Sequence, residues 1–110
     1  MPQTRVLAIP LEDIDSATLL PTYLPINTGL PHACFFLKII NGGTTAITIS
    51  YDGVNDHDVV FANSIAELPS GTVTSLREQS ALWAKGLVVY AKGTAGVGSI
   101  GVSGLYRNLP

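Results

Sequence analysis

The sequence predicts an all-β domain, an antiparallel β-sandwich of jelly-roll type with about eight short strands and an irregular N-terminal arm. Residues 39–61 read as strand, turn, strand, turn, strand, and the middle strand alternates β-branched or aromatic residues with small ones before ending at Asp52-Gly53. Similar short runs recur at close spacing with Gly and Pro between them, and no long segment has a helical period. The length of 110 residues suits one domain with a single core. The topology of the strands does not follow from this pattern.

Composition excludes several classes of partner. Charged residues make up 13% of the chain, the net charge is −2, and the six Lys and Arg residues are scattered. Binding along a nucleic acid needs clustered cations, so we expect no nucleic-acid partner. We also expect no membrane association, because the chain has neither an apolar run of spanning length nor a signal peptide. A surface poor in charge indicates burial in an assembly, or a Ser/Thr-rich coat on an ordinary soluble domain.

Residues 1–30 are predicted to form the extended arm, with one or two short edge strands. Residues 3–9 resemble a strand, and three acidic residues cluster in residues 12–15. Pro21, Pro25 and Pro31 follow, and proline cannot donate to a sheet ladder, so this stretch belongs at an edge or outside the sheet. The arm would wrap its own domain or reach a neighbour. Residues 31–110 are predicted to form the sandwich core.

The regular pattern begins with a strand at residues 33–40. This strand is apolar on both faces except at Lys38, which is typical of a central strand or of one covered by another layer. Asn41-Gly42-Gly43 predicts a hairpin turn that leads into residues 44–51. In that strand Ile47, Ile49 and Tyr51 are expected to face inward, and Ala46, Thr48 and Ser50 outward.

The second half of the chain continues with shorter strands. A turn at residues 52–56 is followed by predicted strands at 57–62, 65–68 and 72–76, and Pro69-Ser70-Gly71 separates the last two. Ser75 and Glu78 have the spacing of a capping box, so residues 75–86 predict at most a short turn of helix. Strands at residues 87–92 and 97–107 close the domain.

The chain offers little recognisable chemistry. Residues 96–101 match the letters of G-x-G-x-x-G, but a strand follows where a dinucleotide site needs a helix. Asp52, Asn55, Asp56, His57 and Asp58 gather oxygen ligands without the spacing of an EF-hand, and a tight turn selects the same residues. Cys34 is expected to be a buried, inert thiol, and the two histidines have no hydrolase motif beside them. We therefore expect no catalytic residue, no metal, no cofactor and no enzymatic activity.

The aromatic residues have two interpretations. Tyr51 and Tyr90 stand on inward faces and are expected to pack in the core. Trp83, the sole tryptophan, lies in a polar segment, so an interface and the core are equally good interpretations of it.

Two stretches carry a resemblance to a known family. They are residues 39–58, with the distinctive run Asp-Gly-Val-Asn-Asp-His-Asp at 52–58, and residues 87–96 together with 102–106. These stretches, the opening at residues 3–15 and the length of the chain are similar to the capsid-decorating stapling proteins of the epsilon-fifteen group of short-tailed Salmonella phages.

The resemblance implies a virion structural protein, made in the host bacterial cytoplasm, that binds the outer surface of the icosahedral capsid. It would clamp neighbouring major capsid protein subunits against the pressure of packaged DNA, as a homodimer on the shell. The predicted interface lies mainly in the arm, because extended segments bury little within their own domain. The residues assigned to it are Arg5, Leu7, Ile9, Leu11, Ile14, Leu19, Tyr23 and Trp83. Trp83 and the polar turn formed by Asp52, Asn55, Asp56 and His57 come second to the arm.

Three other functions remain open. Jelly-roll sandwiches bind glycans, so a carbohydrate-binding or adhesin module on the virion surface is the first, and it requires a groove with two or more exposed aromatic residues. A tail or head–tail connector component is the second, distinguished by a low copy number per virion. A small hydrolase is the third and is disfavoured by the missing motifs.

Overall fold

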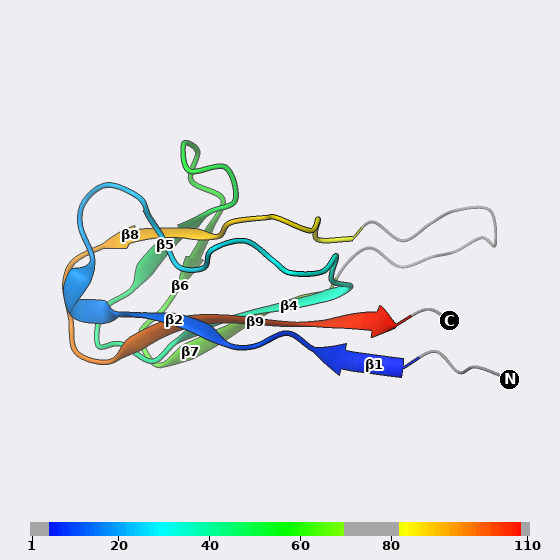
Figure 1. Cartoon of the computed structure of the whole chain (residues 1–110). Coiled ribbons are helices and arrows are strands. Elements are labelled where there is room, and N and C mark those ends of the chain that lie inside the picture. The colour runs from blue at the N-terminus through cyan, green and yellow to red at the C-terminus, as the bar shows by residue number, and fades with distance from the viewer. Residues whose placement is uncertain (1–4, 70–81, 109–110) are drawn as a thin grey trace, which may run out of the picture.

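The computed structural model describes residues 5–69 and 82–108, and these form a sandwich of two antiparallel sheets (Figure 1). The first sheet contains β1 (Arg5–Ala8), β2 (Glu12–Asp15), β4 (Phe36–Asn41), β7 (Ser64–Pro69) and β9 (Ser99–Asn108). The second sheet contains β3 (Leu24–Pro25), β5 (Ile47–Ser50), β6 (Asp58–Val60) and β8 (Tyr90–Gly93). A single 3-10 turn, η1 (Ser16–Thr18), is capped by the Asp15 carboxylate, which accepts a hydrogen bond of 2.9 Å from the Ala17 amide.

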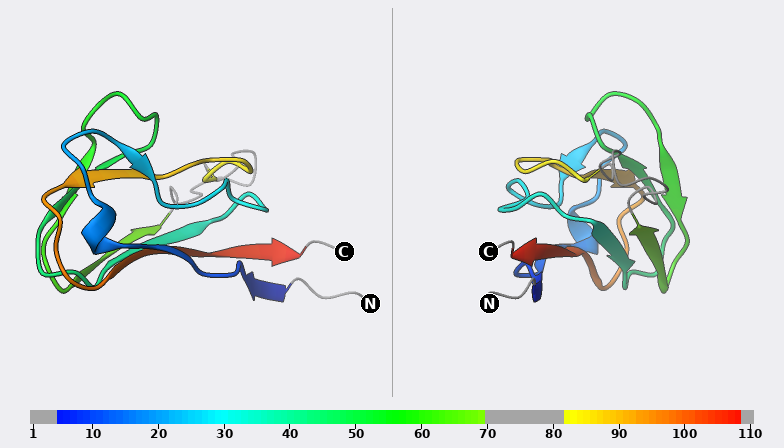
Figure 2. Two further views of the ribbon diagram at one scale, coloured as in Figure 1. Left: turned by 60° about the vertical axis from the view of Figure 1, so that its left-hand side comes forward. Right: turned by 90° about the vertical axis from the view of Figure 1, so that its right-hand side faces the viewer.

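The strand order is that of a jelly roll. β1 and β2 pair with successive halves of β9, so they act as one strand interrupted near Pro10. The sheets then read β1/β2–β9–β4–β7 and β3–β8–β5–β6, and the chain crosses between them at nearly every connection. This is the eight-strand double-sheet arrangement of jelly rolls. Figure 2 shows the two layers from the side and the elongated β9 beneath β8. The predicted fold class is confirmed.

The core forms where inward residues of the two sheets meet. Along β4 the residues alternate between partly exposed and buried, so Leu37 and Ile39 point into the sandwich. Ile47 and Ile49 of β5 face them from the other sheet, as the sequence predicted. The prediction that Ser50 faces outward was wrong, because the following turn folds over it and leaves it fully buried.

The N-terminal segment is part of the sandwich, and the idea that it buries little within its own domain was wrong. Ile9, Leu19, Ile26 and Leu30 belong to the same buried cluster as the central strands. The predicted edge strands exist as β1, β2 and β3, and the rest of the segment follows the open side of the sandwich. Its prolines lie outside the ladders or at their ends, as expected for a residue that cannot donate.

The predicted hairpin turn at Asn41-Gly42-Gly43 was wrong. β4 belongs to the first sheet and β5 to the second, so these residues carry the chain across the sandwich. Neither glycine has a positive φ. Asn41 is 1% exposed, and its side-chain amide donates to the carbonyls of Thr45 at 2.9 Å, Val60 at 3.0 Å and Phe61 at 3.2 Å. Its carbonyl oxygen accepts from the Gly43 amide at 3.0 Å, so one side chain replaces the ladder bonds at the crossing.

Glycines are required at one end of the sandwich, where three connections between strands approach one another closely. A Cβ on Gly43 would lie 2.7 Å from the Ser16 hydroxyl oxygen, and one on Gly96 would lie 2.8 Å from Oγ1 of Thr44. Gly98 has φ +123°, and a Cβ there would overlap the carbonyl oxygen of Gly42. The G-x-G-x-x-G letters therefore arise from backbone packing at one end of the sandwich.

The remaining strands differ from the prediction mainly at their ends. β7 and β9 lie where they were expected, whereas β6 covers only part of residues 57–62. β8 begins at Tyr90, three residues later than predicted. The reason is that the Val89 amide donates to the side-chain oxygen Oδ1 of Asn27, at 2.7 Å, in place of a partner in the ladder. The strand predicted at 72–76 lies outside the described residues, as does most of the possible helical turn at 75–86.

Candidate functional site

The turn at residues 51–57 is held by its own polar side chains. The Asp52 carboxylate accepts from the amides of Asn55 at 2.9 Å and Val54 at 2.8 Å. These bonds hold the pKa of Asp52 well below its ordinary range. Ser50 donates to the same carboxylate at 2.8 Å from beneath the turn. The arrangement stabilises one conformation of the turn and uses most of the acceptor capacity of Asp52.

Tyr51 and His57 close the base of this turn. The Tyr51 hydroxyl donates to Asp58 at 2.6 Å, and burial, followed by this hydrogen bond, raises the pKa of Tyr51. The Tyr51 amide donates to Nδ1 of His57 at 3.0 Å, and the two rings stack with centroids 5.3 Å apart. His57 is therefore engaged in holding the backbone of the turn.

Asp56 attaches the tip of the turn to the second sheet. Its carboxylate accepts from the Tyr23 hydroxyl and from Nζ of Lys92 at 2.9 Å, and these contacts lower the pKa of Asp56. Lys92 also lies 4.6 Å from the Tyr23 ring centroid. In the portion of the chain that is described, no group of three or more His, Cys, Asp or Glu residues is arranged to hold a metal ion. The polar side chains of the turn therefore stabilise its conformation and its attachment to the second sheet.

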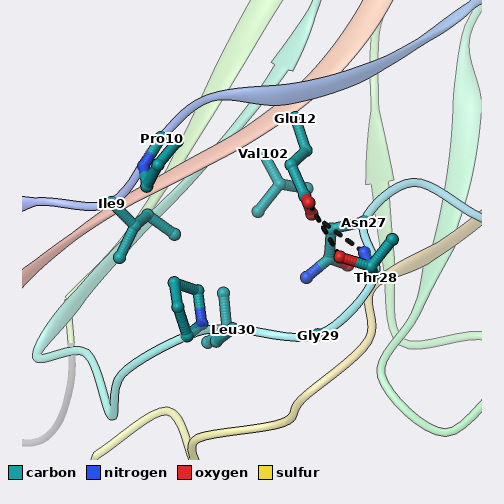
Figure 3. Close-up of a pocket in the computed structure, with 9 residues that line it drawn as sticks. Ile9, Pro10, Glu12, Asn27, Thr28, Gly29, Leu30 and Val102 are labelled. Carbon is teal, nitrogen blue, oxygen red and sulfur yellow. Dashed lines mark hydrogen bonds between the residues drawn. The ribbon is translucent and has the colours of Figure 1, made fainter.

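A slot of about 210 Å³ opens on the edge of the sandwich beside β2 (Figure 3). Ile9, Leu30 and Val102 form its apolar side. The Glu12 carboxylate crosses it and accepts from the amide and the hydroxyl of Thr28, both at 2.8 Å. This double contact fastens residues 26–31 to β2 and closes the edge.

The structure separates the eight residues predicted to form the interface. Ile9 and Leu19 are 7% and 4% exposed in the domain's own core, so these two assignments are corrected. Ile14 is partly buried against the same core. Trp83 is half-buried, donates from Nε1 to the Leu68 carbonyl at 2.9 Å and packs 5.2 Å from the Tyr51 ring, so its role is mainly internal.

The other four residues lie in different parts of the fold. Leu11 is 57% exposed and covers Gly101 of β9. Leu7 is half-buried opposite Tyr106, and Arg5 pairs through its backbone with Asn108. Tyr23 is used by the Asp56 contact on the second sheet. The side chains of Leu7, Leu11 and Tyr23 do not form one surface.

Two rows of apolar residues lie instead on the outer face of the first sheet, with a polar row of Glu67, Lys38 and Ser103 between them. The register places Ala8, Leu105, Phe36 and Pro69 side by side in one row across four strands. Four residues further along β4, Ile40 is paired with Ile65, and Ile65 is 57% exposed. Lys38 and Glu67 are paired between these rows. We name this surface the outer apolar face, and its members are Ala8, Phe36, Lys38, Ile40, Ile65, Glu67, Pro69 and Leu105.

The outer apolar face was missed by sequence reasoning, although its signal was present. Residues 33–40 were recognised as apolar on both sides, and β4 is indeed central. One side, with Leu37 and Ile39, lies in the core, but Phe36 and Ile40 on the other side are only partly covered in this chain. The pattern was interpreted as a central or covered strand, and it did not show that Phe36 and Ile40 would stay partly exposed.

Comparisons with protein-family models, with curated proteins and with solved structures gave no significant match. Within residues 5–69 and 82–108, no helix is long and apolar enough to cross a membrane.

Proposed function

We propose that this protein decorates the outer surface of the icosahedral capsid of a tailed double-stranded DNA phage. It staples neighbouring major capsid protein subunits together, acts as a homodimer on the shell and performs no catalysis. It is made in the host bacterial cytoplasm and resides in the virion. The resemblance described above supplies the identity of the partner.

The outer apolar face is the observation that carries the proposal. With the polar row between them, its rows cover roughly 300–400 Å² at ordinary strand spacings, which is within the range of the largest surface patch on a typical single domain, and such patches are often functional. Burying exposed apolar side chains lowers the free energy, and the outer side of a sheet presents them on one surface. Such a surface supports the proposal that the protein binds to a large protein assembly such as the capsid.

Multivalency makes a modest face sufficient for a long-lived attachment. Once one copy of a dimer has bound, the second contact forms at a high effective concentration. Two faces that are individually weak can therefore hold two capsomeres together. The thermodynamic role of the protein is to oppose their separation.

The experiment is co-sedimentation with purified phage heads that lack the protein. The wild-type chain is expected to bind at saturable copy number, and Ile40→Lys is expected to weaken binding by about tenfold or more, because a second lysine, without a cross-strand acidic partner, must then be desolvated in the contact. Val97→Lys is the matched control, since Val97 is 76% exposed in the connection between β8 and β9 and lies outside the outer apolar face. Equal losses in the two variants, or no binding by the wild type, would contradict the proposal.

A further inference from the structure

A groove lies at the terminal end of the first sheet, where β9 and the connection before β4 meet. Its volume is about 300 Å³, and its lining residues are His32, Ala33, Phe35, Leu82, Tyr106 and Arg107. His32, Ala33 and Phe35 come from the connection between β3 and β4, and Tyr106 and Arg107 from the end of β9. Three aromatic rings and one guanidinium therefore share one concave surface.

The walls of this groove are fixed before any ligand arrives. The His32 and Tyr106 rings stack with centroids 3.9 Å apart and planes within 8° of parallel. The Phe35 amide donates to the Leu105 carbonyl at 3.1 Å, and Cys34 and Trp83 exchange two backbone hydrogen bonds of 2.8 Å. Cys34 is itself fully buried beside the groove. Little side-chain or backbone freedom is lost on binding to a surface held in this way.

Among the described lining residues, the permanent charge is that of Arg107. The Arg107 guanidinium lies 4.7 Å from the Phe35 ring centroid, and none of the six lining residues is acidic. A guanidinium resting on a ring keeps its in-plane donors available, and a planar fork of donors matches a carboxylate. The groove is therefore complementary to a group that joins an apolar body to a carboxylate.

The groove opens at the end of the first sheet, beside the outer apolar face. Leu105 belongs to that face, and Arg107 is two residues further along β9, so the alternation of the strand places both on the outer side. Tyr106 lies between them and packs toward the core, so the groove spans the end of the sheet. A standard interface buries about 800 Å² on each partner, roughly twice the area estimated for the outer apolar face. A partner seated on the face must extend past it, and along β9 the next surface is the groove.

We propose that the groove binds a carboxylate-bearing side chain with an apolar body, presented by the protein partner that covers the outer apolar face. The occupant is an acidic residue flanked by an apolar or aromatic one, and on the proposed function it belongs to the shell subunit. Arg107 supplies the paired donors, and His32, Phe35 and Tyr106 supply the apolar walls.

The first arm of the test examines the groove without any shell. The probes are 3-phenylpropionate and its neutral analogue 3-phenylpropanamide, titrated to millimolar concentration while the ring resonances of His32 and Tyr106 are followed by NMR. The carboxylate is expected to shift both rings saturably and at least about fivefold more tightly than the amide, and Arg107→Gln should remove this preference. Equal binding of the two probes, or a preference that survives Arg107→Gln, would overturn the proposal. So would tighter binding of an oligomer of uronic acids, because the groove would then be a saccharide site.

The second arm uses phage heads that lack the protein. Arg107→Gln is expected to weaken head binding by about 10- to 100-fold, Arg107→Lys by less, and the control Lys85→Gln by under about twofold. Lys85 is an exposed cation that does not line the groove. If the wild type binds heads and Arg107→Gln binds them equally tightly, only the proposed role of the groove is contradicted. Failure of the wild type to bind heads contradicts the proposed function, and the small-molecule arm still decides the chemistry of the groove.

Discussion

Replacing Gly98 with alanine is expected to lower the free energy of unfolding by about 4 kcal/mol, the largest effect of any single methyl addition in the described chain. Two costs combine. A left-handed backbone conformation costs a residue with a Cβ about 1–2 kcal/mol, and Gly98 has φ +123°. Overpacking costs about 1–3 kcal/mol more. The added Cβ would overlap the Gly42 carbonyl oxygen and lie 3.0 Å from the Cα of Gly43, so backbone rather than a flexible side chain must move.

Gly86→Ala separates these two costs. Gly86 also has a positive φ, +89°, but no atom lies within 4 Å of the position its Cβ would take. It is therefore expected to show the conformational cost alone, about 1–2 kcal/mol. Urea unfolding followed by tryptophan fluorescence measures both variants. Equal destabilisation of the two would mean that the packing of the connections at the end of the sandwich contributes nothing.

Asn41→Ala is expected to cost about 3–4 kcal/mol, because buried groups that lose their partner each keep their desolvation penalty. The variant would leave the Gly43 amide and up to three carbonyl groups, those of Thr45, Val60 and Phe61, short of a hydrogen-bond partner. Asn41→Asp should be worse at neutral pH. It keeps the shape but sets a carboxylate among carbonyl oxygens, and its deficit should shrink as the pH falls and the carboxyl gains a proton.

Asn55→Ala is the matched control for the Asn41 variants. Asn55 lies in the exposed turn, where its side chain donates only to Asp52 at 2.8 Å. A loss of at most about 1 kcal/mol is expected there. Chemical denaturation across pH 4 to 8 compares the three variants. A loss at Asn41 no larger than that at Asn55 would show that the crossing between the sheets does not depend on this side chain.

The sequence predicted the strands whose apolar pattern is regular. It did not predict the places where side-chain hydrogen bonds replace those between strands. β4, β7 and β9 were located because their apolar periodicity survives in the structure. The start of β8 was misplaced because the side chain of Asn27, 62 residues away in sequence, accepts a hydrogen bond from the Val89 amide. No local sequence pattern predicts that bond. Asn41-Gly42-Gly43 has the composition of a hairpin turn. Whether the chain turns back or crosses to the other sheet depends on tertiary contacts.

The candidate surface was harder to predict for a physical reason. Proline-rich, irregular sequence was taken to mean a segment free to bind elsewhere. A jelly roll has an open edge, however, and Ile9, Leu19, Ile26 and Leu30 fill it. The outer apolar face consists of alternate residues of β4 and β7 and of one residue each from β9 and β1, so it exists only after the register is known. Its one sequence signal was the two-sided apolar pattern of residues 33–40.

Acylation of Lys38 on head-bound protein tests the central claim most directly. Lys38 lies in the middle of the outer apolar face, whereas Lys85 is exposed elsewhere, so the two lysines report on contact and on general accessibility within one molecule. After binding to phage heads and brief treatment with an acylating reagent, peptide mass spectrometry should show Lys38 protected at least about fivefold, because a buried contact excludes the reagent, while Lys85 is unchanged. Equal modification of Lys38 in the bound and free protein would contradict the assignment of this face to the shell.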